Sequence, residues 1–178
     1  MKIGVFKVLL LYCVVNSYMM IPAFADIKTE YQVKATYLCA FLKYITFDGN
    51  INEYKIGVLG ENPFRGKLKA FHGKEYNGKR ISIHFFGKDA DHAARANCQI
   101  LFVAKSEQLN QKDILKRIDK PNTVTVGDNK WFINSGGMLN LVIVGKKVGW
   151  EVNQPAIRNK TLKVSSKILR LAIKGGTR

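Results

Sequence analysis

The segment Gly60-Glu61-Asn62-Pro63-Phe64-Arg65-Gly66-Lys67 is similar to a nucleotide-binding loop at first sight. A phosphate loop places four residues between its glycines and follows its Lys with a Ser or Thr that binds Mg²⁺. Here five residues separate Gly60 from Gly66, Leu68 follows the Lys, and Pro63 removes one amide from the cradle. We therefore interpret the segment as a turn after a strand rather than as a nucleotide site.

Other side chains that commonly perform catalysis or bind metals are scattered along the sequence. The histidines (His72, His84 and His92) are too far apart for a helical zinc pair, and the cysteines lack zinc-ligand spacing. No Gly-x-Ser-x-Gly elbow is present, and Ser165-Ser166 falls within a predicted helix, where hydroxyls usually bond preceding carbonyl oxygens. No carboxylates are paired as acid–base catalysis requires. We therefore expect no enzymatic activity, no metal site and no cofactor.

The chain is strongly basic, with 29 Lys and Arg against 13 Asp and Glu among 178 residues. Such a balance makes nucleic acid, an anionic membrane and an acidic protein candidate partners. The basic residues are dispersed from Lys28 to Arg178 without an interleaved aromatic motif, which favours a solvated surface over nucleic-acid binding. Near the C-terminus they recur every three to four positions, forming a stripe that suits an acidic partner or a phosphate surface: Lys163, Lys167, Arg170 and Lys174.

The hydrophobic pattern predicts alternating strands and helices in one domain. Thr29 and Gln32 form a capping box for a first amphipathic helix, which Asp48-Gly49-Asn50 ends. Short apolar or alternating segments predict strands, and weaker periodic segments predict helices: strands at 54–59, 81–85, 100–103 and 123–126, and helices at 64–71, 89–96 and 114–118. Strands 138–144 and 148–152 form an antiparallel hairpin, and a last helix starts near Pro155.

This order of elements predicts an α/β fold, a three-layer sandwich with a mostly parallel sheet and a C-terminal antiparallel hairpin. The run Ile100-Leu101-Phe102-Val103 is apolar throughout, which is typical of a strand covered on both faces. We find no long linker and no internal repeat.

Residues 1–25 have the features of a secretory signal peptide. Lys2 and Lys7 supply the positive end, residues 8–21 the apolar stretch, and Ala23-Phe24-Ala25 a small-x-small cleavage site. Cleavage after Ala25 leaves an exported single domain at 26–178; an uncleaved anchor is the alternative. The two cysteines of that domain, Cys39 and Cys98, are either a disulfide or two separate buried thiols.

Several ordered blocks of sequence carry a resemblance to a known family. The C-terminal third contains Ser135-Gly136-Gly137-Met138-Leu139-Asn140-Leu141-Val142, then Val148-Gly149-Trp150-Glu151-Val152-Asn153, and then residues 162–172. Earlier blocks agree in order: Glu30-Tyr31-Gln32-Val33-Lys34-Ala35, Val58-Leu59-Gly60 with Asn62-Pro63-Phe64, Cys98-Gln99-Ile100-Leu101-Phe102-Val103, and Thr125-Val126-Gly127-Asp128. The succession, over nearly the whole exported domain, resembles the YfiR family of periplasmic proteins.

The resemblance implies regulation rather than catalysis. YfiR-like proteins inhibit an inner-membrane diguanylate cyclase by binding its periplasmic region, which lowers cyclic di-GMP and restrains biofilm formation. The resemblance also implies an outer-membrane lipoprotein of the OmpA type as a second partner, and a homodimer is a further expectation. Related domains serve as sensor modules, so a periplasmic small-ligand binder is the alternative, with a cleft lined by Gly60, Asn62, Gly127 and Asp128.

The sequence departs from the family at two kinds of position. Many relatives have a Cys where this chain has Gly57, and it pairs with the equivalent of Cys98, so that bridge cannot form here. We therefore expect no structurally required disulfide between Cys39 and Cys98. Relatives often carry Asn at the position of Ala40 and a basic residue near Ser135, which changes the expected partner surface.

We expect the partner surface on the C-terminal hairpin and helix. The candidate contact residues are Trp150, Glu151, Asn153, Lys167 and Arg170. Glu151 and Arg170 are hard to bury and favour exposure, whereas Trp150 is either a partner anchor or a core residue. Gly136-Gly137 permit a close backbone approach at the entrance of the hairpin.

Overall fold

A computed structural model describes residues 24–173, with side chains from Thr29 onward. The predicted signal segment lies outside the described residues except for Phe24 and Ala25. The chain forms the elements α2 (Phe24–Tyr44), β1 (Ile45–Thr46), β2 (Glu53–Leu59), η2 (Lys69–Phe71), β3 (Glu75–Tyr76), β4 (Lys79–Phe85), α3 (Ala90–Arg95), β5 (Ile100–Val103), η3 (Lys105–Glu107), α4 (Gln111–Arg117), β6 (Val124–Gly127), β7 (Leu139–Val144), β8 (Lys147–Val152), α5 (Gln154–Arg158), β9 (Lys163–Val164) and α6 (Ser166–Leu171).

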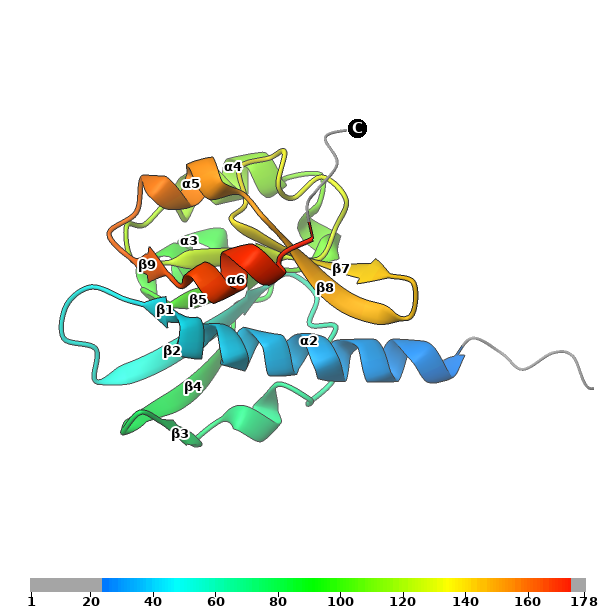
Figure 1. Ribbon diagram of the computed structural model, residues 1–178, viewed down its shortest axis with the longest axis horizontal. Helices are drawn as coiled ribbons and strands as arrows, with labels where there is room; N and C mark the ends of the chain where they lie inside the picture. The colour runs from blue at the N-terminus through cyan, green and yellow to red at the C-terminus, as the bar shows by residue number, and fades with distance from the viewer. Residues whose placement is uncertain (1–23, 174–178) are drawn as a thin grey trace, which may run out of the picture.

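A seven-stranded sheet in the order β3-β4-β2-β5-β6-β7-β8 forms the centre of the domain (Figure 1). Strands β4, β2, β5, β6 and β7 run parallel, and the edge strands β3 and β8 pair antiparallel with their neighbours. The central five follow the order 2-1-3-4-5 of doubly wound α/β domains. The predicted mostly parallel sheet with a C-terminal hairpin is confirmed.

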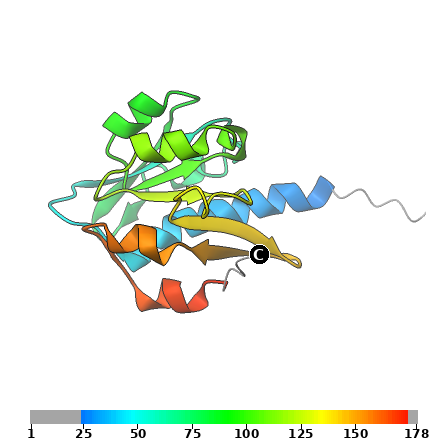
Figure 2. The ribbon, with the colours of Figure 1, turned by 90° about the horizontal axis from the view of Figure 1, so that it is seen from above.

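Two hydrophobic cores on opposite faces of the sheet make the domain three-layered. One core joins the sheet to α2 through Ala35, Leu38, Phe41 and Leu42, and the other joins it to α3 and α4. Figure 2 shows α3 and α4 on one side of the sheet and α2 and α6 on the other. All four residues of β5 are buried, and they alternate between the two cores, as the continuous apolar run predicts.

The first helix differs from the predicted one at both ends. It begins at Phe24, so Thr29 lies within the helix rather than capping it. It ends at Tyr44, because Ile45 and Thr46 leave the helix to pair antiparallel with Val164 and Lys163 of β9. β-Branched residues favour such an extended pairing over a further helical turn.

The prediction of one continuous last helix is also wrong, since the segment forms α5, β9 and α6. Leu162 is buried in the α2 core and β9 pairs with β1, so tertiary packing overrides the helical periodicity between α5 and α6. The Ser165 side chain accepts a hydrogen bond from Lys167 N and caps α6 instead of lying inside a helix. In the predicted helix at 64–71, only the 3₁₀ turn η2 forms.

Gly127 and Gly137 both pack against the ring of Phe132, which is fully buried between them. A Cβ on Gly127 would lie 2.3 Å from Phe132 Cγ, and a Cβ on Gly137 would lie 2.2 Å from Phe132 Cδ1. The close approach expected at the entrance of the hairpin is therefore present. It seats an aromatic ring under the loop between β6 and β7.

Candidate functional site

A cavity of about 310 Å³ opens at the carboxyl end of β6, between the first half of α2 and the hairpin β7–β8. We call it the acidic cavity, because carboxylates from three separate elements line it. Its lining residues are Glu30, Lys34, Asp128, Asn129, Lys130, Asn140, Leu141, Val142, Ile143 and Glu151. Carboxyl ends of strands are the usual location of ligand sites in α/β sheets.

A buried ion pair holds α2 to the carboxyl end of β6 beside this cavity. Lys34 Nζ donates to Asp128 Oδ2 at 2.9 Å, and the two side chains are 3% and 1% exposed. Tyr31 OH donates to the same oxygen at 2.7 Å, and Glu30 forms a second ion pair with Lys34. Burial, and then the charge of Asp128, raise the pKa of the Tyr31 hydroxyl above its ordinary range, so Tyr31 stays a donor. Both Tyr31 and Lys34 bind Asp128 through Oδ2, and neither contacts Oδ1.

Asn140 and Glu151 lie opposite each other on β7 and β8 and form the far wall of the cavity. Asn140 is fully buried, and its Nδ2 donates to Glu151 Oε2 at 2.9 Å. Three buried polar atoms of the cavity residues have no hydrogen-bond partner among the described residues: Asp128 Oδ1, Asn129 Nδ2 and Asn140 Oδ1. Buried polar groups are nearly always paired, so these three atoms are exceptions to the rule.

The predicted ligand cleft is only partly assembled. Asp128 lines the acidic cavity, directly after Gly127 at the end of β6. Gly60 and Asn62 lie instead in the turn after β2, where Asn62 Oδ1 accepts a hydrogen bond from Phe64 N. A Cβ on Gly60 would lie 2.5 Å from Ser106 Oγ, so this glycine allows close packing rather than ligand approach.

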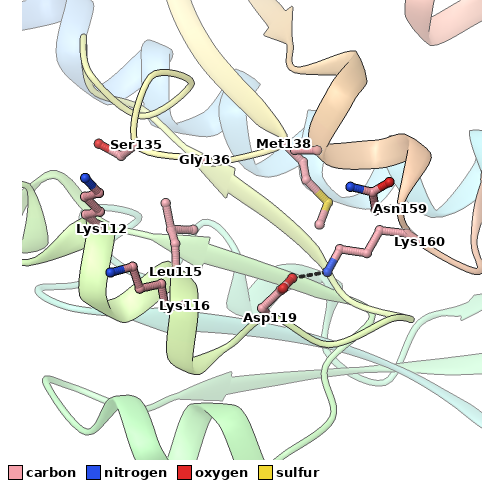
Figure 3. A pocket seen from close by; sticks show the side chains of 10 residues that line it. Lys112, Leu115, Lys116, Asp119, Ser135, Gly136, Met138, Asn159 and Lys160 are labelled. Atoms are coloured by element: carbon pink, nitrogen blue, oxygen red, sulfur yellow. Dashed lines mark hydrogen bonds and ion pairs between the residues drawn. The ribbon is translucent and has the colours of Figure 1, made fainter.

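A second cavity, of about 270 Å³, lies between α4, α5 and the loop before β7 (Figure 3). Lys112, Lys116 and Lys160 give it a basic character. Figure 3 shows Lys160 directed at Asp119, with which it forms an ion pair, and its Nζ also donates to Lys120 O at 2.9 Å. Lys112 and Lys116 are exposed on the surface of α4. Lys160, the buried cation of this lining, is therefore already paired with a carboxylate and a carbonyl oxygen.

The residues predicted to contact a partner fall into two groups. Trp150 is half-buried: its ring packs edge-on against Tyr37 and Phe41, and its Nε1 donates to Ile168 O at 3.1 Å. Asn153 caps α5 by accepting a hydrogen bond from Ala156 N. Both side chains thus hold α2, α5 and α6 against the hairpin.

The other predicted contact residues are open to solvent or to the cavity. Lys167 and Arg170 are exposed on α6, and Glu151 is half-buried at the acidic cavity. Large apolar side chains are exposed in the same C-terminal region: Ile143 and Val144 at the tip of the hairpin and Leu171 at the end of α6. Figure 1 shows α6 beside α2, with the hairpin extending past the end of α6.

Cys39 and Cys98 are free thiols on opposite faces of the sheet. Cys39 packs against the α2 core, whereas Cys98 belongs to the core under α3 and α4. This placement agrees with the expectation that the two form no bridge. Burial raises the pKa of each thiol to about 12, so both are protonated and unreactive at neutral pH.

Sequence reasoning did not identify the Lys34–Asp128 pair or the wall formed by Asn140. One signal was available, because Lys34 is placed with Leu38 and Phe41 on the buried stripe of the first helix. A Lys at a buried helical position requires a partner charge. The partner itself is 94 residues away, and no pattern within the sequence gives its position.

Neither a metal cluster nor a membrane helix is present in the part of the chain that the structure describes. Residues 24–173 contain no group of three or more His, Cys, Asp or Glu side chains placed to hold a metal ion. None of the helices in that range is long and apolar enough to cross a membrane.

The layered sheet and its two flanking cores define a three-layer α/β domain. The chain belongs to the YfiR/HmsC-like family, whose pattern it matches over residues 31–173. The resemblance seen in the sequence is thereby confirmed.

Similar structures support the fold alone. A conserved domain protein from Vibrio cholerae O1 biovar El Tor str. N16961 superimposes with a TM-score of 0.56 at 11% identity. The alignment covers 80% of this chain and 58% of the Vibrio chain, so this chain matches little more than half of that protein. A search of curated proteins gave no match.

Proposed function

We propose that this protein is a periplasmic inhibitor of an inner-membrane diguanylate cyclase, which lowers cyclic di-GMP and restrains biofilm formation. The observation that carries the proposal is the family match over nearly the whole described domain. The exposed basic and apolar side chains of α6 and the hairpin support it, because they offer a contact surface outside the packed core.

Export is part of this proposal. The signal features of residues 1–25 predict cleavage after Ala25, which places residues 26–178 in the periplasm. A mass measurement of the protein recovered from a periplasmic fraction tests this directly. A chain beginning at Asp26 is the expected result, and a full-length chain retained in the membrane would contradict it.

Inhibition in this scheme is a shift between two states of the cyclase. The inhibitor lowers signalling only if it binds the inactive receptor state more tightly than the active one, by about 1.4 kcal/mol for each tenfold change in the ratio. No contact with the catalytic domain in the cytoplasm is needed. The protein therefore needs a specific surface rather than a catalytic group.

We place that surface on α6 and the β7–β8 hairpin. Lys167 and Arg170 supply exposed positive charge, and Leu171 supplies exposed apolar area beside them. Trp150 contributes indirectly, because its indole N–H donates a hydrogen bond to Ile168 O and holds α6 in position. The complementary partner surface is acidic with an apolar centre.

Glu151 and Asn153 complete the set of proposed contact residues. Glu151 contributes through the acidic cavity, and Asn153 through the cap that orients α5. An OmpA-type outer-membrane lipoprotein as a second partner stays a prediction from the resemblance, and a homodimer stays a separate prediction.

A small-ligand sensor is the second candidate function. The acidic cavity favours it, because that cavity is lined by charged and polar residues and opens at a strand carboxyl end. A sensor and an inhibitor are compatible if ligand binding changes the affinity for the cyclase.

The proposed function is tested in cells. Deleting the gene should raise cyclic di-GMP and surface attachment, and the exported chain 26–178 supplied in trans should restore both. A version lacking residues 1–25, and so retained in the cytoplasm, is the matched control and should restore neither. Unchanged cyclic di-GMP after deletion, under conditions where the protein is produced, would contradict the proposal.

A further inference from the structure

The exposed large apolar side chains gather at one end of the sheet. Because β4, β2, β5, β6 and β7 run parallel, the segments that follow them all leave from the same end. Among the described residues, five of the six exposed large apolar side chains end one of these strands or lie in the segment that follows it: Phe85, Leu109, Trp131, Ile143 and Val144. We call these five residues and the segments that carry them the carboxyl-end surface.

The hairpin β7–β8 projects beyond its neighbours at this end. Gly127, the last residue of β6, pairs with Asn140, and β7 continues for four more residues to Val144. At a rise of about 3.3 Å per residue, the tip therefore stands roughly 13 Å beyond the end of β6. Ile143 and Val144 are 49% and 54% exposed there. Figures 1 and 2 show the tip directed to the same side as the first turns of α2.

Exposed lysines accompany these apolar side chains. They lie in the segments after β4, β5 and β6 and in the turn of the hairpin, and none forms an ion pair within residues 29–173: Lys88, Lys105, Lys130, Lys146 and Lys147. Lys130 Nζ is 5.1 Å from the centre of the Trp131 ring. Each apolar side chain of the carboxyl-end surface thus has a positive charge within a few residues of it in the sequence.

The acidic residues of the same segments offset little of this charge. The side chains of Glu107 and Asp128 are buried, and Asp128 is paired with Lys34. Glu61 and Asp89 are exposed, but Asp89 accepts a hydrogen bond from His92 N and caps α3. The carboxyl-end surface therefore combines exposed apolar side chains with an excess of positive charge.

This combination fits a lipid surface better than a protein surface. Apolar side chains interleaved with Lys are typical of segments in a bilayer interface, where the apolar groups enter the acyl boundary and the lysines are attracted to anionic headgroups. A protein hot spot instead gathers its anchors at the centre of one packed patch. Here they are spread over strands as far apart as β4 and β7, which are separated by about 19 Å across the sheet.

We propose that the carboxyl-end surface docks on an anionic phospholipid bilayer. Ile143 and Val144 at the tip of the hairpin enter the interface together with Trp131, and the lysines beside them contact lipid phosphate. A fluid bilayer accepts these separate points at once, whereas a protein partner would need a matched pocket for each. The α6 surface stays open in this orientation, because the hairpin extends past the end of α6 (Figure 1).

This inference stands on the exposed residues of one end of the fold and does not depend on inhibition of a cyclase. If the chain binds vesicles and the cell experiment fails, only the proposed function is wrong. If the cell experiment succeeds and the chain does not bind vesicles, only the present inference is wrong.

The first test is co-sedimentation of chain 26–178 with lipid vesicles. Vesicles of phosphatidylcholine with about 25% phosphatidylglycerol should bind the chain at least tenfold more tightly than vesicles of phosphatidylcholine alone, and salt should weaken the binding. Equal binding to both vesicles, or binding to neither, would overturn the proposal. Failure to bind vesicles together with loss of cyclase inhibition in Ile143→Ser/Val144→Ser would assign this end to a protein partner instead, and would overturn it too.

Tryptophan fluorescence tests which residues enter the lipid. The chain has two tryptophans, and the ring of Trp150 is packed against Tyr37 and Phe41, whereas Trp131 is 47% exposed. Vesicles that contain phosphatidylglycerol should shift the emission to shorter wavelengths, because the Trp131 indole leaves water. Trp131→Phe should abolish the shift. A shift of the same size in Trp131→Phe would overturn the proposed orientation.

Charge variants separate docking at this end from adsorption of a basic protein by its overall charge. Lys146→Glu/Lys147→Glu should weaken binding to the anionic vesicles at least tenfold. Arg80→Glu/Lys120→Glu makes the same change of charge at exposed positions where β4 begins and before β6, at the opposite end of the sheet, and should stay within about twofold of the wild type. Equal weakening in both variants would overturn the proposal.

An apolar variant tests insertion of the hairpin tip. Ile143→Ser/Val144→Ser keeps every charge and should weaken binding about tenfold, because less apolar area leaves water. Both side chains are exposed, so the melting temperature should be unchanged. Wild-type binding by this variant would show adsorption through charge alone and would overturn the proposal.

Discussion

Gly57 of β2 lies directly against Cys98, which precedes β5. A Cβ built on Gly57 would stand 2.9 Å from Cys98 Sγ, closer than any ordinary contact. A side chain at position 57 therefore points at the sulfur of Cys98. The same geometry explains why the family resemblance implies a disulfide between these two positions in relatives, and why the Gly leaves Cys98 a free thiol here.

The variant Gly57→Cys should form a disulfide with Cys98 on exposure to air. The Cβ of position 57 lies within bonding reach of the Cys98 sulfur, while Phe86 and Leu101 must shift slightly to admit the new side chain. The oxidised protein should be more stable than its reduced form by about 2–4 kcal/mol. Non-reducing mass spectrometry shows the loss of two hydrogens, and Gly57→Cys/Cys98→Ala provides the control that cannot bridge. A fully reduced Gly57→Cys protein after oxidation would contradict the geometry.

The two native thiols should make the protein lose stability at alkaline pH. Burial raises the pKa of Cys39 and Cys98 from 9.0 to about 12, so the folded state holds its thiol protons after the unfolded state has lost them. Their contribution is complete below pH 9 and is lost as the pH rises toward 12. Urea unfolding at pH 8 and pH 10.5 measures the change. The double variant Cys39→Ala/Cys98→Ala should lose less stability over this interval, and an identical loss in both proteins would disprove the assignment.

Lys34→Met should destabilise the domain by about 3–5 kcal/mol, because it leaves the buried carboxylate of Asp128 without its ammonium partner. Adding Asp128→Asn removes the unpaired charge and should recover much of the loss. Lys116→Met is the matched control, since Lys116 forms only an exposed pair with Asp113 at 3.9 Å and should change stability by less than about 1 kcal/mol. Urea unfolding of the four proteins measures these values. A similar small effect at Lys34 and Lys116 would show that the buried pair does not support the fold.

Gly137→Ala should cost about 1–3 kcal/mol, because the new methyl group meets the ring of Phe132 at 2.2 Å. In a Phe132→Ala background the same change should be almost neutral, since the ring that it would strike is gone. The double-mutant cycle, measured by thermal unfolding, isolates the coupling between the two positions. Additive effects would mean that Gly137 is required for another reason.

The layers of the fold could be predicted from local sequence patterns, whereas the pairing of strands distant in sequence could not. The apolar run of β5 and the short spacing between β7 and β8 determined their burial and pairing in advance. The pairing of β1 with β9 joins segments more than a hundred residues apart. This pairing ends the first helix at Tyr44 and divides the predicted last helix into α5 and α6. Helical periodicity is a local pattern, so it gives no sign of a strand partner so far away in the sequence.

The candidate site shows the same division. Residue type alone marks Trp150 and Glu151 as candidates, but the sequence does not show that Trp150 packs on Tyr37 while Glu151 lines a cavity. The acidic cavity is formed by α2, the end of β6 and the hairpin, so it exists only in the assembled fold. Lys34 gave one local sign of it, because a charge on a buried helical stripe needs a partner.

The central claim is that the exported domain inhibits a diguanylate cyclase through α6. The most direct measurement is the synthesis of cyclic di-GMP from GTP by the full-length cyclase in lipid nanodiscs, in which added GTP reaches the cytoplasmic domain and added chain 26–178 reaches the periplasmic region. Wild-type protein should lower the rate in a saturable way. The variant Lys167→Glu/Arg170→Glu, whose exposed positions predict an unchanged melting temperature, should inhibit at least tenfold more weakly, and Lys112→Glu/Lys116→Glu on the opposite face should inhibit as the wild type does. No inhibition by the wild-type domain of any cyclase from the same organism would contradict the account.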